Sequence, residues 1–198
     1  MTQPTLLMRF CRFVLGLFGW RVLRNLPPSH KYIVVGAWHT SNWDFPLAVL
    51  AAGAMGLKLN FIGKQELVSG KLGWFMKRLG IIGVDRSQRN QFVQTIADLY
   101  ANVDELRIVV PAEGTRSKSE YWRTGFYYMA LAAKVPIAFG ILDAGNKQIG
   151  IDGYFVPTGN RNEDLQKVID FFKDKKGLRP SKQGQAKFRP LEQTDSGI

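Results

Sequence analysis

Apolar and polar residues along the chain fall into blocks that alternate between the pattern of buried strands and that of helices. The apolar run at residues 31–38 follows the breaker Pro27-Pro28 and predicts a buried strand, and residues 44–55 predict a helix with Pro46 in its first turn. We expect further strands at residues 57–63, 81–84, 106–110, 135–142 and 148–156, and further helices at residues 71–79, 91–103, 121–134 and from a cap near Asn162 to about Lys175. This order predicts one α/β domain, with a largely parallel or mixed sheet flanked by helices and an antiparallel pair of strands near its end.

Residues 5–20 form an apolar segment with an amphipathic pattern. The segment is shorter than the ~20 apolar residues of a spanning helix, and two arginines interrupt it. At helical spacing, one narrow face holds Thr5, Arg9, Arg12 and Gly16, and the opposite face holds Leu7, Phe10, Cys11, Val14 and Phe18. This pattern is typical of an amphipathic helix in a membrane interface, and it also fits a helix that covers the core. A cleaved signal peptide is a third interpretation, but residues 19–21 are a poor cleavage site and the arginines lie inside the apolar run.

Basic residues are concentrated at the two ends of the chain. Among 198 residues, 27 are Lys or Arg and 16 are Asp or Glu, which gives a formal net charge of +11. No acidic residue precedes Asp44, whereas the body of the chain is nearly neutral. This distribution disfavours a nucleic-acid partner and favours contact between the ends and an anionic lipid surface. One cysteine and two histidines exclude an internal disulfide framework and argue against a metal site.

Candidate catalytic residues follow the first expected strand. Residues 31–38 run into His39, and Asp44 lies at the expected start of the next helix. A tight turn between strand and helix would bring this carboxylate back onto the imidazole, where it fixes the tautomer and stabilises the imidazolium. The chain supplies no nucleophile for such a pair, so we expect a substrate to provide the hydroxyl. A histidine bonded to a local aspartate is also a common structural pair, and the spacing alone does not decide between the two.

Two further polar clusters follow other expected strands. Asp85 and Arg86 come directly after residues 81–84, and residues 113–117 (EGTRS) come shortly after residues 106–110. Because the carboxyl ends of parallel strands meet at one edge of a sheet, all three clusters could lie together. Arginine presents a planar fork that matches phosphate, and glycine lets the backbone approach a ligand. Each arginine could instead be a surface charge or the partner of a nearby carboxylate.

In order and spacing, these clusters resemble the motifs of the glycerolipid acyltransferases, the 1-acyl-glycerol-3-phosphate acyltransferase superfamily. Residues 39–44 resemble the HxxxxD motif, residues 80–86 (GIIGVDR) the second motif, which ends in a phosphate-binding arginine, residues 113–117 the EGTR motif, and residues 135–137 (VPI) the fourth, apolar motif. Three positions depart from the family pattern. Gly83 replaces an aromatic residue, Ala112 replaces a proline, and no second proline follows residues 135–137.

The resemblance implies an O-acyltransferase that needs no metal and no cofactor. It would move a fatty acyl group from acyl-CoA or acyl carrier protein to the hydroxyl of a lysophospholipid such as 1-acyl-glycerol-3-phosphate. His39 is implied as the general base and Asp44 as the residue that orients it. The residues implied in acceptor binding are Arg86, Glu113, Gly114, Thr115 and Arg116.

On this interpretation the chain comprises a membrane-interface helix at residues 1–24, an acyltransferase domain at residues 25–176 and a loose basic tail at residues 177–198. We expect a peripheral or monotopic protein at the cytoplasmic face of a membrane with anionic lipid. Four tryptophans are candidates either for an acyl groove or for the core, namely Trp38, Trp43, Trp74 and Trp122.

Three other functions fit the same residues. The acceptor could be a lysolipid without phosphate, such as a lyso-aminolipid. The same base could activate water, which would make the protein a thioesterase. A protein with a decayed site could bind lipid without catalysis, although the complete His39–Asp44 and Glu113–Arg116 pairs argue against decay. Acyl transfer that depends on His39 would separate the first expectation from the last two.

Overall fold

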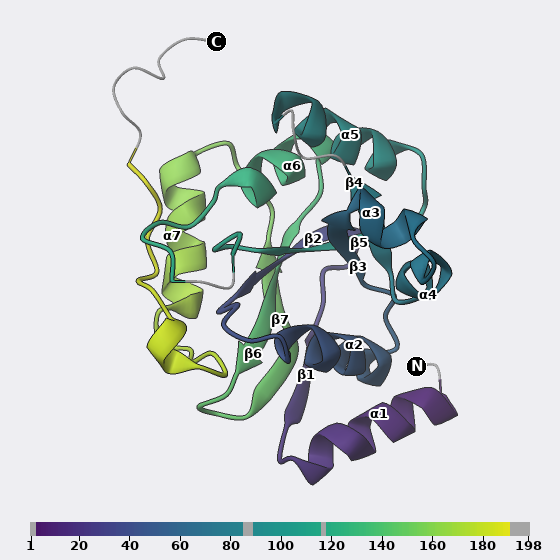
Figure 1. Cartoon of the computed structure of the whole chain (residues 1–198). Coiled ribbons are helices and arrows are strands. Elements are labelled where there is room, and N and C mark those ends of the chain that lie inside the picture. The colour runs from purple at the N-terminus through teal and green to yellow at the C-terminus, as the bar shows by residue number, and fades with distance from the viewer. Residues whose placement is uncertain (1–2, 85–88, 116–117, 191–198) are drawn as a thin grey trace.

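A seven-stranded sheet runs through the centre of the molecule, in the order β1-β7-β6-β2-β5-β3-β4 (Figure 1). The computed structural model describes residues 3–84, 89–115 and 118–190. The strands are β1 (Arg21–Asn25), β2 (Lys31–Ala37), β3 (Asn60–Lys64), β4 (Ile81–Val84), β5 (Leu106–Pro111), β6 (Ile137–Asp143) and β7 (Gln148–Phe155). Five neighbouring strands from β6 to β4 are parallel, whereas β7 is antiparallel to β6 and β1 runs parallel to β7. The predicted α/β fold with a largely parallel sheet is therefore confirmed.

Helices cover both faces of the sheet. They are α1 (Leu6–Leu17), α2 (Asp44–Met55), α3 (Gln65–Ser69), α4 (Gly73–Arg78), α5 (Arg89–Ala101), α6 (Gly125–Ala133), α7 (Arg161–Phe172) and the 3-10 helix η1 (Pro180–Lys182). Alternate residues of β2 point to opposite faces. Val34 belongs to the core beneath α1 and α2, and Val35 to the core beneath α5, α6 and α7. The sheet is thus the middle layer of three.

Helix α1 lies along α2 on the outside of the molecule (Figure 1). Cys11 and Leu15 are buried against α2, and the Cys11 sulfur lies only 2.6 Å from the place that a Cβ on Gly53 would occupy. Met8 and Val14 are half-buried. The apolar side chains that point outward are each at least 61% exposed, namely Leu6, Leu7, Phe10, Phe13 and Leu17 of the helix and Phe18 at its C-cap. The helix therefore both covers the core and presents an apolar surface. Within the described residues, no helix has the length and apolar character required to cross a bilayer.

Three segments differ from the sequence expectations. The membrane-interface helix was expected to extend over residues 1–24, but residues 21–25 form the edge strand β1. Residues 65–69 form the single-turn helix α3, which the pattern did not predict. The tail expected to be loose from residue 177 is ordered over residues 177–190, since it carries η1 and hydrogen bonds to the body of the protein.

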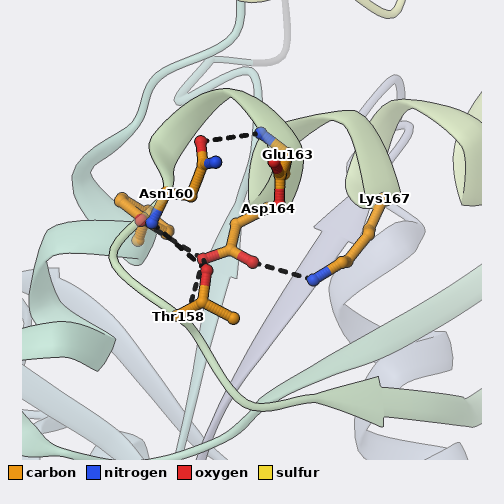
Figure 2. A network of polar contacts seen from close by, with 6 residues as sticks. Thr158, Asn160, Glu163, Asp164 and Lys167 are labelled. Carbon is orange, nitrogen blue, oxygen red and sulfur yellow. Dashed lines mark hydrogen bonds and ion pairs between the residues drawn. The ribbon is translucent and has the colours of Figure 1, made fainter.

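The start of α7 is fixed by a network of polar contacts (Figure 2). The cap is Asn160 rather than Asn162, because the Asn160 side chain accepts a hydrogen bond from the Glu163 amide. The fully buried Asp164 carboxylate accepts bonds from the amide and hydroxyl of Thr158, at 2.7 and 3.1 Å, and pairs with the Lys167 ammonium at 2.9 Å. Burial favours the neutral acid, but the Lys167 and Thr158 hydrogen bonds outweigh it and hold the Asp164 pKa below its usual value.

Candidate active site

The loop that follows β2 is anchored by the buried side chain of Trp38. The indole packs edge-on against the Trp122 ring, with centroids 4.9 Å apart, and donates a hydrogen bond from Nε1 to the Phe172 carbonyl at 3.3 Å. Trp38 is only 3% exposed. A large buried aromatic with its polar atom satisfied is rigid. It fixes the backbone immediately before the next residue, His39.

His39 and Asp44 meet at the carboxyl end of β2. Their side chains are joined by a contact of 2.9 Å between His39 Nδ1 and Asp44 Oδ2. The same carboxylate oxygen accepts hydrogen bonds from the amides of Thr40 and Ser41, both at 2.9 Å. Asp44 is the first residue of α2, where the helix dipole favours a negative charge. The five-residue spacing thus closes a loop in which three donors converge on one oxygen.

This contact assigns the protons of the imidazole. An ionised carboxylate only accepts hydrogen bonds, so His39 Nδ1 carries the hydrogen in the neutral ring and Nε2 carries the lone pair. The His39 side chain is 23% exposed, whereas that of Asp44 is 8% exposed. A substrate can therefore reach the ring while the carboxylate stays behind it. Chemically, such an arrangement can serve as a general base with its orienting acid.

Glu113 supports His39 from the neighbouring strand. It follows the end of β5, is 5% exposed, and accepts a hydrogen bond from the His39 backbone amide through Oε1 at 2.9 Å. Burial raises the pKa of the Glu113 carboxyl above its usual value, and hydrogen bonds oppose that effect only in part. The resemblance implied a role for Glu113 in acceptor binding, and the structure adds a direct hydrogen bond to the backbone of His39.

The turn after Glu113 is tight and requires glycine. Gly114 has φ of +67°, its amide donates to the Pro111 carbonyl at 3.1 Å, and a Cβ there would lie 3.0 Å from Arg123 Cγ. Thr115 follows on the exposed side of this turn. The structure brings Glu113, Gly114 and Thr115 to the edge of the sheet that holds His39. Two predicted site residues, Arg86 and Arg116, lie outside the described residues.

Two departures from the family motifs have local reasons. The amide of Ala112 donates to the Gly36 carbonyl at 2.8 Å, a bond that proline could not make. At Gly83 in β4, a Cβ would lie 2.3 Å from Val68 Cγ2 and 3.2 Å from Gln65 Cα. Helix α3 therefore occupies the space that a side chain at position 83 would need.

An apolar cavity of about 240 Å³ lies between α2 and the sheet and reaches the His39–Asp44 pair. At one end it is lined by His39, Asp44 and Phe45, and further in by Met55 and Leu59. Strands β2, β3, β5, β6 and β7 form its floor. The arrangement places the His39 imidazole at the end of an apolar cavity. Among the described residues, no cluster of His, Cys, Asp and Glu side chains could hold a metal ion.

Comparison with known proteins agrees with this geometry. A family model described as Acyltransferase matches residues 20–138, more than half of the chain. The chain belongs to the acyltransferase family. The motif region from His39 to Ile137 lies within the matched residues.

Two similar proteins show how far the likeness extends. An uncharacterized acyltransferase of Schizosaccharomyces pombe is 33% identical over 154 residues, which cover 72% of this chain and 52% of that protein. The chain thus spans about half the length of that relative. The crystal structure of the 1-acyl-sn-glycerophosphate (LPA) acyltransferase PlsC from Thermotoga maritima has a similar fold, with a TM-score of 0.56 and 20% identity over 83% of this chain and 74% of that one.

The four tryptophans considered for the acyl groove have two different environments. Trp38 and Trp122 are buried in the core, and Trp38 also lines the cavity. Trp43 and Trp74 are each 68% exposed, so neither lies in the core. Thr40 and Ser41 hold the Asp44 carboxylate through their backbone amides, and sequence reasoning assigned them no role. Any residue type except proline supplies such a donor, so the sequence carries little signal for it.

Proposed function

We propose that this acyltransferase moves a fatty acyl group from an acyl thioester to the hydroxyl of a lysophospholipid, with His39 as the general base. The observation that carries the proposal is the 2.9 Å His39–Asp44 pair at the end of an apolar cavity. A base beside an apolar chamber suits a reaction whose substrates have a long hydrocarbon chain and one reacting polar group. The resemblance to 1-acyl-glycerol-3-phosphate acyltransferases supplies the preferred acceptor.

In the proposed reaction, His39 Nε2 takes the proton of the acceptor hydroxyl while that oxygen attacks the thioester carbonyl carbon. Asp44 stabilises the imidazolium that forms. When the tetrahedral intermediate collapses, the carbon–sulfur bond breaks and the imidazolium gives its proton to the departing thiolate. The products are an ester and a thiol, and the base returns to its starting state. The scheme requires no covalent intermediate on the enzyme.

The surroundings of the pair suit separate roles in substrate binding. The apolar cavity under α2 would hold a fatty acyl chain with its reacting end at His39. Arg86 and Arg116 would bind the acceptor phosphate, because both lie in motifs to which the family resemblance assigns acceptor binding. Gly114 and Thr115 would shape the site for the glycerol part of the acceptor. Acyl-CoA and acyl carrier protein remain the two candidate donors.

We propose that α1 holds the enzyme on the anionic cytoplasmic surface of a membrane, as a peripheral or monotopic protein. Five large apolar side chains of this helix and that of its C-cap, Phe18, point away from the body of the protein. Arg9 is exposed as well, whereas Arg12 Nε donates a hydrogen bond to the Ala54 carbonyl of α2 at 2.9 Å. Apolar side chains at the acyl boundary with arginines among the headgroups are the pattern of interfacial helices. The lysolipid acceptor and its product both reside in such a surface.

The experiment incubates the purified enzyme with acyl-CoA or acyl carrier protein and a panel of acceptors, followed by mass spectrometry of the products. The panel contains 1-acyl-glycerol-3-phosphate, other lysophospholipids and a lyso-aminolipid. We expect a diacyl product with a phosphate-bearing acceptor. Free fatty acid as the sole product would show a thioesterase instead, and a product from the lyso-aminolipid alone would contradict the phosphate-bearing acceptor.

A further inference from the structure

The chain that follows α7 crosses the edge of the sheet at which the catalytic pair lies. Residues 173–190, here called the C-terminal segment, begin directly after Phe172 and run beside α7 (yellow in Figure 1). The segment is first tied to the end of β6, since the Lys176 amide donates to Asp143 Oδ1 at 3.2 Å and the Lys176 carbonyl accepts from the Ala144 amide at 2.7 Å. It lies outside residues 20–138, the part of the chain that the family model matches.

The C-terminal segment then contacts the loop that holds His39. The Arg179 amide donates to Thr40 Oγ1 at 3.0 Å, and Thr40 is only 2% exposed. Gly177 is packed so closely that an added Cβ would lie 2.8 Å from Thr40 Oγ1 and 3.0 Å from Trp38 Cβ. The hydrogen bond from Arg179 and the close packing of Gly177 therefore both involve Thr40.

The segment is itself held in shape on both sides of this contact. The Gln183 side chain accepts from the Gly177 amide at 3.1 Å and donates to the Lys175 carbonyl at 2.9 Å. Further along, the Lys187 carbonyl accepts from the Trp122 amide at 2.9 Å, and the Phe188 and Trp122 rings pack with centroids 5.5 Å apart. Because these contacts fix the position of the C-terminal segment, the segment can restrict the position of Thr40.

Thr40 connects the C-terminal segment to the catalytic carboxylate. Its side chain accepts from Arg179, while its amide donates to Asp44 Oδ2, the oxygen that contacts His39 Nδ1. We propose that the C-terminal segment is a positioning element of the active site, in which Gly177 and the Arg179 amide hold Thr40, and Thr40 holds Asp44 against the His39 ring. The proposal rests on the proposed function only in assigning catalysis to the His39–Asp44 pair.

Steady-state kinetics of two variants test the proposal. Thr40→Val removes the acceptor oxygen at nearly constant volume, and Gly177→Ala pushes the segment away from Thr40. We expect kcat to fall ~10-fold or more in each, with KM for both substrates within about 3-fold of wild type, because the misplaced base is needed in the transition state and not for binding. Thr40→Ser, which keeps the oxygen, should retain most of the activity. Gly125→Ala is the matched glycine control, since a Cβ there meets only Met129 Cε at 3.9 Å.

A second readout needs no substrate. The chain has two histidines, His30 and His39, so the ring nitrogens of nitrogen-15-labelled protein give a simple spectrum. The signals of His39 should move in Thr40→Val and Gly177→Ala, while those of His30 stay in place. If the wild-type enzyme transfers no acyl group, the proposed function fails and the His39 signals still decide whether the segment positions the pair. Variants that keep kcat, or that leave the His39 signals unmoved, would overturn the proposal.

Discussion

His39 is held at its ring and at its backbone by carboxylates from two different parts of the chain. Asp44, at the start of α2, contacts Nδ1 of the ring, and Glu113, which follows the end of β5, accepts the bond from the His39 amide. Asp44 and Glu113 therefore have different roles. In the proposed mechanism the first stabilises the imidazolium, and the second bonds the main chain that follows β2 to the end of the neighbouring β5. Only the first belongs to a spacing that can be recognised along the sequence.

The buried Glu113 carboxyl predicts a pH dependence of stability. Burial raises its pKa in the folded protein above the ordinary value of 4.5, so ionisation costs more in the folded than in the unfolded chain. The folded state therefore loses stability as pH rises through the raised pKa. Glu113→Gln cannot ionise, so we expect its melting temperature to exceed that of wild type at pH 8 and the difference to shrink below pH 4.5. An equal difference in melting temperature between Glu113→Gln and wild type at both pH values would contradict this prediction.

At the level of single elements, local patterns predicted those elements whose residues pack regularly. The bounds of α2 and β4 match the expected residues 44–55 and 81–84. Strand β1 was missed because it is a short edge strand with two arginines, and its pairing with β7 joins residues far apart in the sequence. One turn of helix, as in α3, is too short to display a period. The Asn160 cap could have been found from the capping-box spacing to Glu163.

The candidate site divides in the same way. The His39–Asp44 contact could be predicted because only a short loop separates His39 from Asp44 at the start of α2. The contacts of Glu113 with His39 and of Arg179 with Thr40 join residues 74 and 139 positions apart, through backbone amides that every residue except proline has. No local pattern reports such bonds. For the same reason the ordered residues 177–190 were expected to be a loose tail.

The packing of α1 on α2 predicts that one substitution, Gly53→Ala, changes the free energy of unfolding in opposite directions with and without the Cys11 side chain. A Cβ on Gly53 would lie 2.6 Å from the Cys11 sulfur but 3.6 Å from Cys11 Cβ. We expect Gly53→Ala to lower the free energy of unfolding by about 1–3 kcal/mol, because the contact is overpacked. In a Cys11→Ala background the same substitution should raise it by up to about 1 kcal/mol, because alanine is a better helix former than glycine. Denaturant titration measures both, and equal effects in the two backgrounds would disprove the close contact.

At the scale of the whole molecule, the apolar outer face of α1 predicts binding to lipid vesicles. Phe10 and Phe13 are 61% and 64% exposed. Burying a phenylalanine stabilises by roughly 1.5–3 kcal/mol, so we expect the double substitution by serine to weaken sedimentation with anionic vesicles at least ~10-fold. Val156→Ser is a matched control, because Val156 is 63% exposed but follows β7. Equal vesicle binding by the double variant and the control would show that another surface meets the lipid.

The most direct test of the account measures acyl transfer to 1-acyl-glycerol-3-phosphate by wild type, His39→Ala and Asp44→Asn, each shown by its melting temperature to be folded. The account predicts a turnover rate on the order of 10²-fold to 10⁴-fold lower in both variants, because the base and the charge that supports its protonated form act in the same step. Product formation by folded His39→Ala at the wild-type rate would contradict it.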